Sequence, residues 1–349
     1  MKFLTHPASD MTTGLSSFLS DRSAPLLDVR SPSEFAAGHI PGAQSFPLFS
    51  DQERALVGTC YKKQGRKAAV KKGLALVGPK MADFVAEAEQ ITEGENLRLY
   101  CWRGGMRSGS MAWLLRQYGF TVEVLEGGYK TYRRGLLSFF EQDLPLLILT
   151  GYTGSGKTVL LQALRQHGAQ VVDLEALANH QGSSFGNQKS DGQPTTEQFQ
   201  NLVFEAFRRL DLGRPIWIED ESLSIGKVNL PDPLFQQMKD KPRVLLEVPR
   251  EQRIRYLVQD YGSVPTEKLA AATEAIQKRL GDEKTKQALE ALQRHDLSTA
   301  ADAILHYYDR QYRKAIRHRA IFRKYELTGQ ETFDDLALRI LRDMPNPYS

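Results

Sequence analysis

Cysteine and long apolar runs are both scarce in this chain. Only two cysteines, Cys60 and Cys101, occur among its 349 residues, and their wide separation argues against a disulfide framework and fits a reducing cytoplasm. No segment approaches the roughly 18 apolar residues of a membrane-spanning helix. The first twenty residues also lack the basic start and unbroken apolar core of a signal peptide. We therefore expect a cytoplasmic protein with no membrane partner.

A strong excess of one charge is missing as well. The chain has 46 Lys and Arg against 42 Asp and Glu, for a formal net charge of +4. Charged residues make up 25% and apolar residues 41%, which is ordinary for a soluble folded protein and excludes a disordered one. At this length the chain can fill two cores. Local clusters of charge are therefore more informative than the total.

Short apolar strands alternate with helical patterns along most of the chain. This order predicts two α/β domains, each with a parallel sheet and crossover helices. In the first half the expected strands are 25–30, 97–101 and 121–127, and the expected helices are 81–90 and 107–118. In the second half the expected strands are 146–150, 169–175, 215–221 and 243–249. We predict domains over 1–140 and 141–349, the second ending in a helical, basic region after residue 265. The polar stretch 181–198 is interpreted as a functional loop or lid.

One cysteine stands at a place suited to nucleophilic chemistry. Cys101 ends a short apolar strand, and a loop rich in glycine and arginine (CWRGGMRSG, 101–109) leads from it into a helix. Amides of such a loop and helix start, with nearby arginines, favour a thiolate and bind oxyanions. We predict that Cys101 is the catalytic nucleophile. Its predicted anion loop comprises Arg103, Gly104, Gly105 and Arg107. The alternative is that Cys101 is a buried structural thiol, but this would leave the glycines and arginines of the loop unexplained. The other cysteine, Cys60, is expected to be structural.

The strand at 146–150 runs into a complete phosphate-binding P-loop, GYTGSGKT, and a helix follows. In such loops glycines let backbone amides approach a phosphate, the lysine meets the outer phosphates and the threonine can bind Mg²⁺. The predicted diphosphate-binding residues are Gly151, Gly154, Gly156, Lys157 and Thr158. Asp220, at the end of an apolar strand, joins Thr158 as a candidate Mg²⁺ ligand. Arg250, Arg253 and Arg255 either close over phosphates or are solvated.

Two stretches gather positive charge. Residues 62–80 contain seven basic residues and no acidic one, and residues 310–324 contain seven basic residues with aromatic residues between them. Basic and aromatic side chains together suit RNA, whose phosphates and splayed-out bases they bind. A solvated helix face is the alternative for each stretch. The candidate RNA contacts are Lys62, Lys63, Arg66, Arg313 and Arg317.

Roughly residues 12–138 resemble the rhodanese, or sulfurtransferase, fold. The matching segments are DVR (28–30), EF (34–35), GHIPGA (38–43), the Cys101 loop and LEGGY (125–129). In enzymes of this fold the cysteine carries sulfur or selenium as a persulfide or perselenide. Arg107 lies one residue further from the cysteine than in common sulfurtransferases, and such a wider loop suits a phosphate or selenophosphate ion. Of the matching residues, we expect Asp28, Arg30, Glu34 and His39 to hold the fold together by hydrogen bonds.

The rhodanese-like domain and the P-loop domain in one chain resemble the tRNA 2-selenouridine synthase family. The stretches VGTCYKKQGR (57–66) and NHQGSSFG (179–186) resemble that family too. The resemblance implies a bacterial enzyme that acts on the wobble uridine (U34) of the tRNAs for lysine, glutamate and glutamine. It implies that a 5-substituted 2-thiouridine is S-geranylated by geranyl diphosphate. The geranylthio group is then replaced by selenium from selenophosphate through a Cys101 perselenide.

Further expectations concern partners and competing functions. We expect no tightly bound cofactor, Mg²⁺ as an optional ion, a selenophosphate-supplying enzyme as a partner, and a monomer. Our hypothesis is that the P-loop holds the diphosphate of the geranyl donor, with a nucleotide as the alternative ligand. The nearest competing function is a nucleotide-dependent sulfurtransferase that acts on a small molecule or a carrier protein. A rhodanese-type phosphatase and a regulatory RNA-binding P-loop protein are further alternatives.

Overall fold

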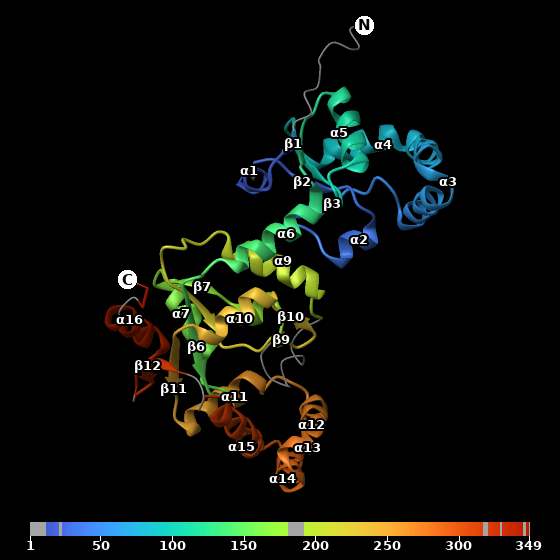
Figure 1. Ribbon diagram of the computed structural model, residues 1–349. Helices are drawn as coiled ribbons and strands as arrows, with labels where there is room; N and C mark the ends of the chain where they lie inside the picture. The colour runs from blue at the N-terminus through green and yellow to red at the C-terminus, as the bar shows by residue number, and fades with distance from the viewer. Residues whose placement is uncertain are drawn as a thin grey trace. The chain divides into compact units, whose positions relative to one another are not determined.

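The computed structural model describes residues 12–20, 23–180, 192–316, 320–328, 330–344 and 347–348. The chain divides into two compact units, Met1–Phe139 and Phe140–Ser349, both drawn in Figure 1. Each unit is described by itself below. None of the helices in the described ranges combines the length and apolarity that a membrane crossing requires.

The first unit is built on a parallel sheet. Its strands are β1 (Thr12–Thr13), β2 (Leu26–Asp28), β3 (Ala43–Ser45), β4 (Asn96–Tyr100) and β5 (Thr121–Leu125). They lie in the order β1-β5-β4-β2-β3, and each neighbouring pair is parallel. The strand β4, which leads to Cys101, is therefore central and buried at four of its five residues. The parallel α/β architecture predicted from the sequence is confirmed.

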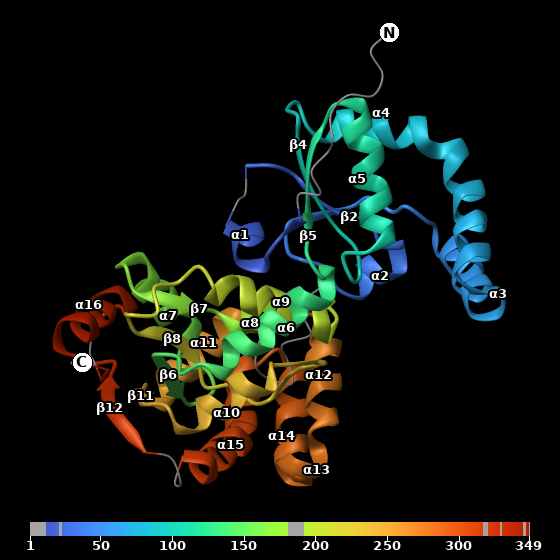
Figure 2. The same ribbon diagram turned by 45° about the horizontal axis from the view of Figure 1, so that its top comes forward.

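Helices connect these strands. They are α1 (Leu15–Ser20), α2 (Pro32–Ala37), α3 (Asp51–Val77), the 3₁₀ turn Gly78–Lys80, α4 (Met81–Ile91), α5 (Met106–Tyr118) and α6 (Gly128–Glu141). Figure 2 shows α5 alongside β5. Met111, Ala112 and Leu115 of α5 are fully buried in the core that also contains Leu99 of β4. This packing fixes the start of α5 close to the end of β4.

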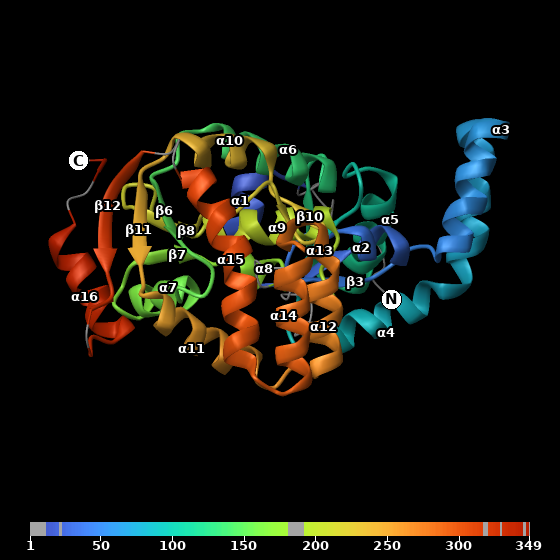
Figure 3. The same cartoon turned by 90° about the horizontal axis from the view of Figure 1, so that it is seen from below.

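The long helix α3 is the element of the first unit that is hardest to predict from the pattern of apolar residues. A capping box starts it: the Ser50 side chain accepts from the Glu53 amide, and Glu53 accepts from the Ser50 amide. Only Ala69 and Gly73 are buried along its 27 residues. Gly65 interrupts the helix with a φ of 82°, a conformation that favours glycine. Figure 3 shows α3 projecting away from the sheet of its own unit.

The second unit also has a parallel sheet. Its strands are β6 (Leu146–Gly151), β7 (Gln170–Val172), β8 (Ile216–Glu219), β11 (Arg243–Glu247) and β12 (Ile321–Glu326). The order is β12-β11-β6-β8-β7, with parallel pairing throughout. A short antiparallel hairpin is formed by β9 (Ser224–Ile225) and β10 (Val228–Asn229). All six residues of β6 are buried, so the P-loop follows the central strand.

The helices of the second unit fall into two groups. Those between or after the sheet strands are α7 (Lys157–Gln166), α8 (Leu174–Leu177), α9 (Thr196–Phe207), α10 (Asp232–Asp240) and α16 (Phe333–Asp343). Between β11 and β12 come α11 (Arg250–Tyr261), α12 (Thr266–Ala275), α13 (Gln277–Leu280), α14 (Asp282–Gln293) and α15 (Leu297–Ile316). Figure 3 shows α12, α14 and α15 side by side. Within this second group, α12 to α15 are the helical region predicted beyond residue 265, and α11 precedes it.

Two segments need a closer comparison with the sequence-based expectations. The strand β12 interrupts the helical region, and it places Arg323 and Lys324 on a sheet edge instead of a helix. Lys324 pairs there with Glu247 at 2.6 Å, and charged side chains are common on edge strands. Of the loop predicted over 181–198, residues 181–191 lie outside the described ranges, and α9 begins at Thr196.

Candidate functional site

Cys101 lies where the central strand of the first unit meets a helix. Its side chain is 3% exposed, and the loop 102–105 joins β4 to α5. The Ser108 hydroxyl, fully buried on the first turn of α5, lies 3.2 Å from the Cys101 sulfur and is its hydrogen-bond donor. This serine was not among the predicted site residues. A small hydroxyl residue on the first turn after an anion loop is the signal that could have indicated it.

The glycines of this region allow two loops to pack very closely. Gly104 and Gly128 both have φ of +60°. A Cβ on Gly104 would lie 2.7 Å from the Leu125 carbonyl oxygen, and one on Gly128 would lie 2.2 Å from the Cys101 carbonyl oxygen. The Tyr129 amide also donates to that Cys101 oxygen at 2.8 Å. The LEGGY segment therefore fixes the backbone of the cysteine loop from behind.

The start of α5 offers hydrogen-bond donors to a ligand. The first amides of a helix have no partner inside it. In the part of the chain that the structure describes, none of the amides of residues 102–108 donates a hydrogen bond to the protein. The positive end of the helix macrodipole lies at the same place. A tetrahedral anion bound here would face the sulfur of Cys101 and the backbone donors together.

The two arginines of the anion loop differ in their surroundings. Arg103 is exposed. Arg107 donates to both carboxylate oxygens of Glu34 at 2.5 and 3.2 Å. Burial alone would raise the pKa of Glu34, but the hydrogen bond and charge of Arg107 outweigh it and hold that pKa below its ordinary value. Arg107 thus ties α5 to α2, while Arg103 is the arginine presented to solvent beside the loop.

The remaining rhodanese-like motifs are structural in their contacts. Arg30 is 1% exposed and donates to both carboxylate oxygens of Asp28 and to the Gly38 carbonyl at 2.6–3.0 Å. Its guanidinium lies 4.0 Å from the centre of the Tyr129 ring. His39 stacks on Phe35 at 3.9 Å. These contacts agree with the expectation that Asp28, Arg30, Glu34 and His39 hold the fold together.

The P-loop of the second unit is closely packed by its neighbours. Gly154 and Gly156 both have φ of +75°. A Cβ on Gly156 would lie 2.3 Å from the Phe333 ring, and one on Gly151 would lie 2.9 Å from the Leu246 carbonyl oxygen. Lys157 folds back over the loop and donates to the Gly151 carbonyl at 3.2 Å. Thr158 is half-buried on the first turn of α7. The loop therefore has the glycine conformations and the helix N-terminus that phosphate binding requires.

Asp220, the other candidate Mg²⁺ ligand, is occupied by protein contacts. Its carboxylate accepts a hydrogen bond from the Thr150 hydroxyl at 2.7 Å and lies 3.9 Å from the Arg243 guanidinium. In the described residues no cluster of three or more His, Cys, Asp or Glu side chains could hold a metal ion. Both contacts involve the same carboxylate oxygen, Oδ2, and the role of Asp220 as a Mg²⁺ ligand stays a prediction.

Two carboxyl groups at the end of β8 have raised pKa values, and one of them, Glu221, lies near the P-loop lysine. Glu221 shares a hydrogen bond with Glu175; burial, and then the charge of Glu175, raise its pKa to about 8 against the opposing charge of Lys157. Glu219 is fully buried, and burial and the charge of Asp173 raise its pKa as well. A carboxyl group with a raised pKa can take or release a proton near neutral pH. From the sequence, only Asp220 was singled out at this strand end.

The arginines after β11 are paired within the protein. Arg253 is 4% exposed and makes two hydrogen bonds to the Asp309 carboxylate at 2.8 and 2.9 Å. Arg250 also donates to Asp309, and to Asp302, at 2.9 and 2.7 Å. Arg255 is exposed. Arg250 and Arg253 thus join α11 to α15. The sequence suggested that they either close over phosphates or are solvated, and these contacts are neither.

The candidate RNA contacts occupy different kinds of surface. Lys62, Lys63 and Arg66 are exposed on α3, and within the described ranges none of them takes part in an ion pair. Arg313 is exposed on α15, whereas Arg317 lies outside the described residues. Tyr312, one of the interleaved aromatic residues, is directed to the P-loop: its hydroxyl lies 3.0 Å from the Thr150 hydroxyl, and its ring lies 4.3 Å from that of Tyr152. Tyr312 is therefore half-buried and not free to stack on a base.

Known protein families match this chain over both of its units. A family model described as the tRNA 2-selenouridine synthase AAA domain matches residues 144–332, and a rhodanese-like domain model matches residues 12–134. The tRNA 2-selenouridine synthase of Psychromonas ingrahamii is 35% identical over 340 residues, which cover 88% of this chain and 92% of the relative. The chain belongs to the tRNA 2-selenouridine synthase family. The resemblance inferred from the motifs is confirmed.

Other members of the tRNA 2-selenouridine synthase family also match over two thirds or more of both chains. The protein of that name from Nitrosomonas europaea is 32% identical over 374 residues, covering 92% of this chain and 96% of the relative. The one from Bordetella bronchiseptica is 43% identical over 255 residues, covering 70% of this chain and 67% of the relative. Membership of the selenouridine synthase family therefore extends over both units, and the Cys101 loop and the P-loop are to be explained together.

Proposed function

We propose that this protein is a tRNA 2-selenouridine synthase that converts 5-substituted 2-thiouridine at U34 of tRNA-Lys, tRNA-Glu and tRNA-Gln to 2-selenouridine. The observation that carries the proposal is Cys101, whose buried sulfur accepts from Ser108 at the donor-rich start of α5. A thiol in such a place is suited to carry a chalcogen atom next to a bound oxyanion. Family membership supports tRNA as the substrate.

The first proposed step is S-geranylation. The sulfur of the 2-thiouridine attacks C1 of geranyl diphosphate, the carbon–oxygen bond breaks, and pyrophosphate leaves with the electron pair. The nucleobase loses its N3 proton at the same time. The P-loop amides and Lys157 stabilise the negative charge on the departing pyrophosphate. This alkylation is needed because sulfur in a thiocarbonyl is a poor leaving group, whereas a geranylthiolate departs readily.

The second proposed step delivers selenium through Cys101. Selenium from selenophosphate becomes bonded to the Cys101 sulfur, water adds to phosphorus, and the phosphorus–selenium bond breaks to leave a Cys101 perselenide and free phosphate. The loop amides and Arg103 hold the phosphate group during this transfer. The perselenide selenium then attacks C2 of the uridine, and geranylthiolate leaves. Selenium is more oxidised in the perselenide than in selenophosphate, so loading requires a two-electron acceptor such as a small disulfide. A thiol returns those electrons when it cleaves the sulfur–selenium bond and releases the selenouridine.

The tRNA is proposed to meet the exposed basic residues. Lys62, Lys63 and Arg66 on α3, together with Arg313 on α15 and Arg317, provide positive charge for phosphate contacts. Phosphate contacts of this kind supply most of the binding free energy and make it depend on salt.

The proposal is tested with purified full-length protein, a 2-thiouridine tRNA, geranyl diphosphate, selenophosphate and a thiol–disulfide buffer. In the Cys101→Ala variant we expect S-geranylated tRNA to accumulate at the wild-type rate and 2-selenouridine to be absent. The Cys60→Ala variant is the matched control and should retain both steps, because Cys60 is half-buried on α3 and distant in sequence from the loop. Mass analysis of the nucleosides measures both products.

Other outcomes identify the competing functions. Labelling of Cys101 by sulfur from thiosulfate, with no label from selenophosphate, would establish a sulfurtransferase. Loss of both products in the Cys101→Ala variant, while Cys60→Ala is unaffected, would contradict the division of the reaction between two sites.

A further inference from the structure

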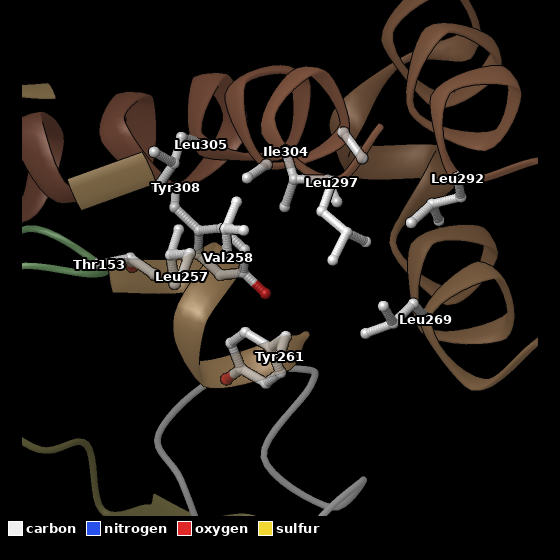
Figure 4. A pocket seen from close by; sticks show the side chains of 12 residues that line it. Thr153, Leu257, Val258, Tyr261, Leu269, Leu292, Leu297, Ile304, Leu305 and Tyr308 are labelled. Atoms are coloured by element: carbon white, nitrogen blue, oxygen red, sulfur yellow. The ribbon is translucent and has the colours of Figure 1, made fainter. Parts of the chain in front are cut away.

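An apolar pocket adjoins the P-loop. It lies between α11 and α15, with residues of α12 and α14 closing one side, and Thr153 of the P-loop forms part of its wall. Figure 4 shows the side chains of Leu257, Tyr261, Ile304 and Tyr308 around a common space. Neither proposed reaction step gives this pocket a role, although it lies next to a phosphate-binding loop.

The wall of this pocket matches a hydrocarbon and not a polar ligand. Apart from Thr153 and the hydroxyls of Tyr261 and Tyr308, its lining is apolar: aliphatic side chains and the two tyrosine rings. Leu257, Val258 and Ile304 are only half-buried, so apolar surface there still faces solvent. Removing apolar surface from water is favourable. A nucleobase would bring several hydrogen-bonding groups into the pocket with few partners, which is unfavourable.

The pocket is continuous with the P-loop by direct packing. A Cβ on Gly154 would lie 2.9 Å from Leu257 Cγ, so α11 touches the loop at this glycine. Arg253 donates to the Thr153 carbonyl at 3.1 Å and is neutralised by Asp309. Lys157 is therefore the cation that the P-loop itself provides, and the route from the loop into the pocket passes aliphatic side chains.

We propose that this pocket binds the hydrocarbon chain of a short prenyl diphosphate whose diphosphate group lies on the P-loop. This inference rests on the proposed function and adds the location and length limit of the chain. The free space of about 60 Å³ has room for roughly four to six water-sized atoms, which corresponds to one isoprene unit. The second unit of a geranyl chain requires the half-buried side chains at the mouth to move. A third unit, as in farnesyl, requires a larger displacement and is disfavoured.

The test measures binding to the full-length chain by titration calorimetry. The ligands are inorganic pyrophosphate, ADP, and dimethylallyl, geranyl and farnesyl diphosphates. For the wild type we expect geranyl diphosphate to bind more tightly than pyrophosphate and farnesyl diphosphate. Ala301→Leu adds bulk inside the pocket. It should lower the affinity for geranyl diphosphate by about tenfold or more, because several methylene groups of the chain can no longer be buried there. Pyrophosphate binding should be unchanged, which also shows that the variant is folded.

Two further variants complete the experiment. His306→Leu adds similar bulk at an exposed position of the same helix, outside the pocket, and should leave every affinity unchanged. Ile304→Ala widens the pocket. It should raise the affinity for farnesyl diphosphate, relative to that for geranyl diphosphate, by several-fold.

The contradicting results are distinct. If Ala301→Leu leaves geranyl diphosphate binding unchanged, the chain binds elsewhere and this inference falls while the proposed function stands. If ADP binds more tightly than geranyl diphosphate and is weakened by Ala301→Leu, the pocket holds a nucleoside. If the wild type binds no prenyl diphosphate, the proposed geranylation itself is wrong.

Discussion

The hydroxyl of Ser108 is the side-chain donor closest to the chemistry of Cys101, because it lies 3.2 Å from the sulfur and is fully buried. A hydrogen bond to a charged group contributes about 1.5–3 kcal/mol. Ser108→Ala should therefore slow selenium transfer by roughly 10- to 100-fold, while geranylation is unaffected. Single-turnover formation of 2-selenouridine measures this, with the exposed Ser110→Ala as control. Equal rates in both variants would show that the Ser108 hydroxyl serves only packing.

The ion pair between Glu34 and Arg107 predicts a pH-dependent stability. Because the pKa of Glu34 is lowered in the folded state, its contribution is present above the ordinary carboxyl pKa and is lost as pH falls through the lowered value. Glu34→Gln should cost about 1.5–3 kcal/mol of unfolding free energy at pH 7. The cost should begin to fall below the ordinary glutamate pKa of about 4.3 and should be small only at a pH below the lowered pKa of Glu34. Chemical denaturation at both pH values measures the difference. A cost that stays constant with pH would contradict the charge-based explanation.

At the scale of elements, the loop between β4 and α5 depends on one of its two adjacent glycines. Gly104 has a φ of +60° and no space for a Cβ, whereas Gly105 has a φ of −106° and no atom within 4 Å of a Cβ position. Gly104→Ala should therefore destabilise the first unit by at least about 1–2 kcal/mol and abolish selenium transfer. Gly105→Ala should be tolerated, since the backbone amide of residue 105 remains. Thermal unfolding and the selenium-transfer assay distinguish them, and equal behaviour of the two variants would refute this view of the loop.

The helix α3 is the element for which we predict tRNA binding. Reversing the charge of Lys62, Lys63 and Arg66 should weaken tRNA binding and reduce the slope of log affinity against log salt by roughly 0.7–0.9 per lost phosphate contact. A matched change of net charge on the helices α13 and α14, made with Lys278→Glu, Lys284→Glu and Lys286→Glu, should have a much smaller effect. Affinity measured across a salt series decides this. Equal losses in the two triple variants would mean that total charge, and not α3, governs binding.

Some elements were predictable from the sequence and others were not, for physical reasons. The strands β6 and β8 begin as continuous apolar runs, and β4 is apolar except for Asn96 and Arg98; all three lie inside parallel sheets and are almost wholly buried, so their composition reveals them. The helix α3 buries only Ala69 and Gly73 and has no apolar stripe to detect. The edge strand β12 has three consecutive exposed residues, Phe322, Arg323 and Lys324, so it shows no alternating strand pattern. Elements that bury few residues have no clear pattern of apolar residues, so the sequence does not predict them.

The same reasoning applies to the candidate sites. Cys101 and the P-loop are short contiguous motifs whose residue types are dictated by local backbone geometry, so sequence alone located them. The pairing of Arg250 and Arg253 with Asp309 joins residues more than fifty positions apart and depends on how α15 packs on α11. Tyr312 faces the P-loop for the same reason. Contacts of this range are set by tertiary packing and not by a local pattern.

For the whole molecule, we propose that the P-loop unit alkylates the tRNA sulfur and that the cysteine unit delivers selenium. Each unit carries its own sheet, with its motif after the central strand β6 in one and β4 in the other. Loss of either site should therefore stop the pathway at a different nucleoside. A defect at the P-loop leaves 2-thiouridine, and a defect at Cys101 leaves S-geranyl-2-thiouridine.

The most direct measurement is mass analysis of tRNA nucleosides from cells that lack this protein and are complemented with wild type, Lys157→Ala or Cys101→Ala. The wild type should restore 2-selenouridine. Lys157→Ala should yield mainly 2-thiouridine, and Cys101→Ala should accumulate the S-geranylated nucleoside without 2-selenouridine. Selenouridine at the wild-type level with Cys101→Ala, or geranylation that survives Lys157→Ala while nucleotide turnover disappears, would contradict the account.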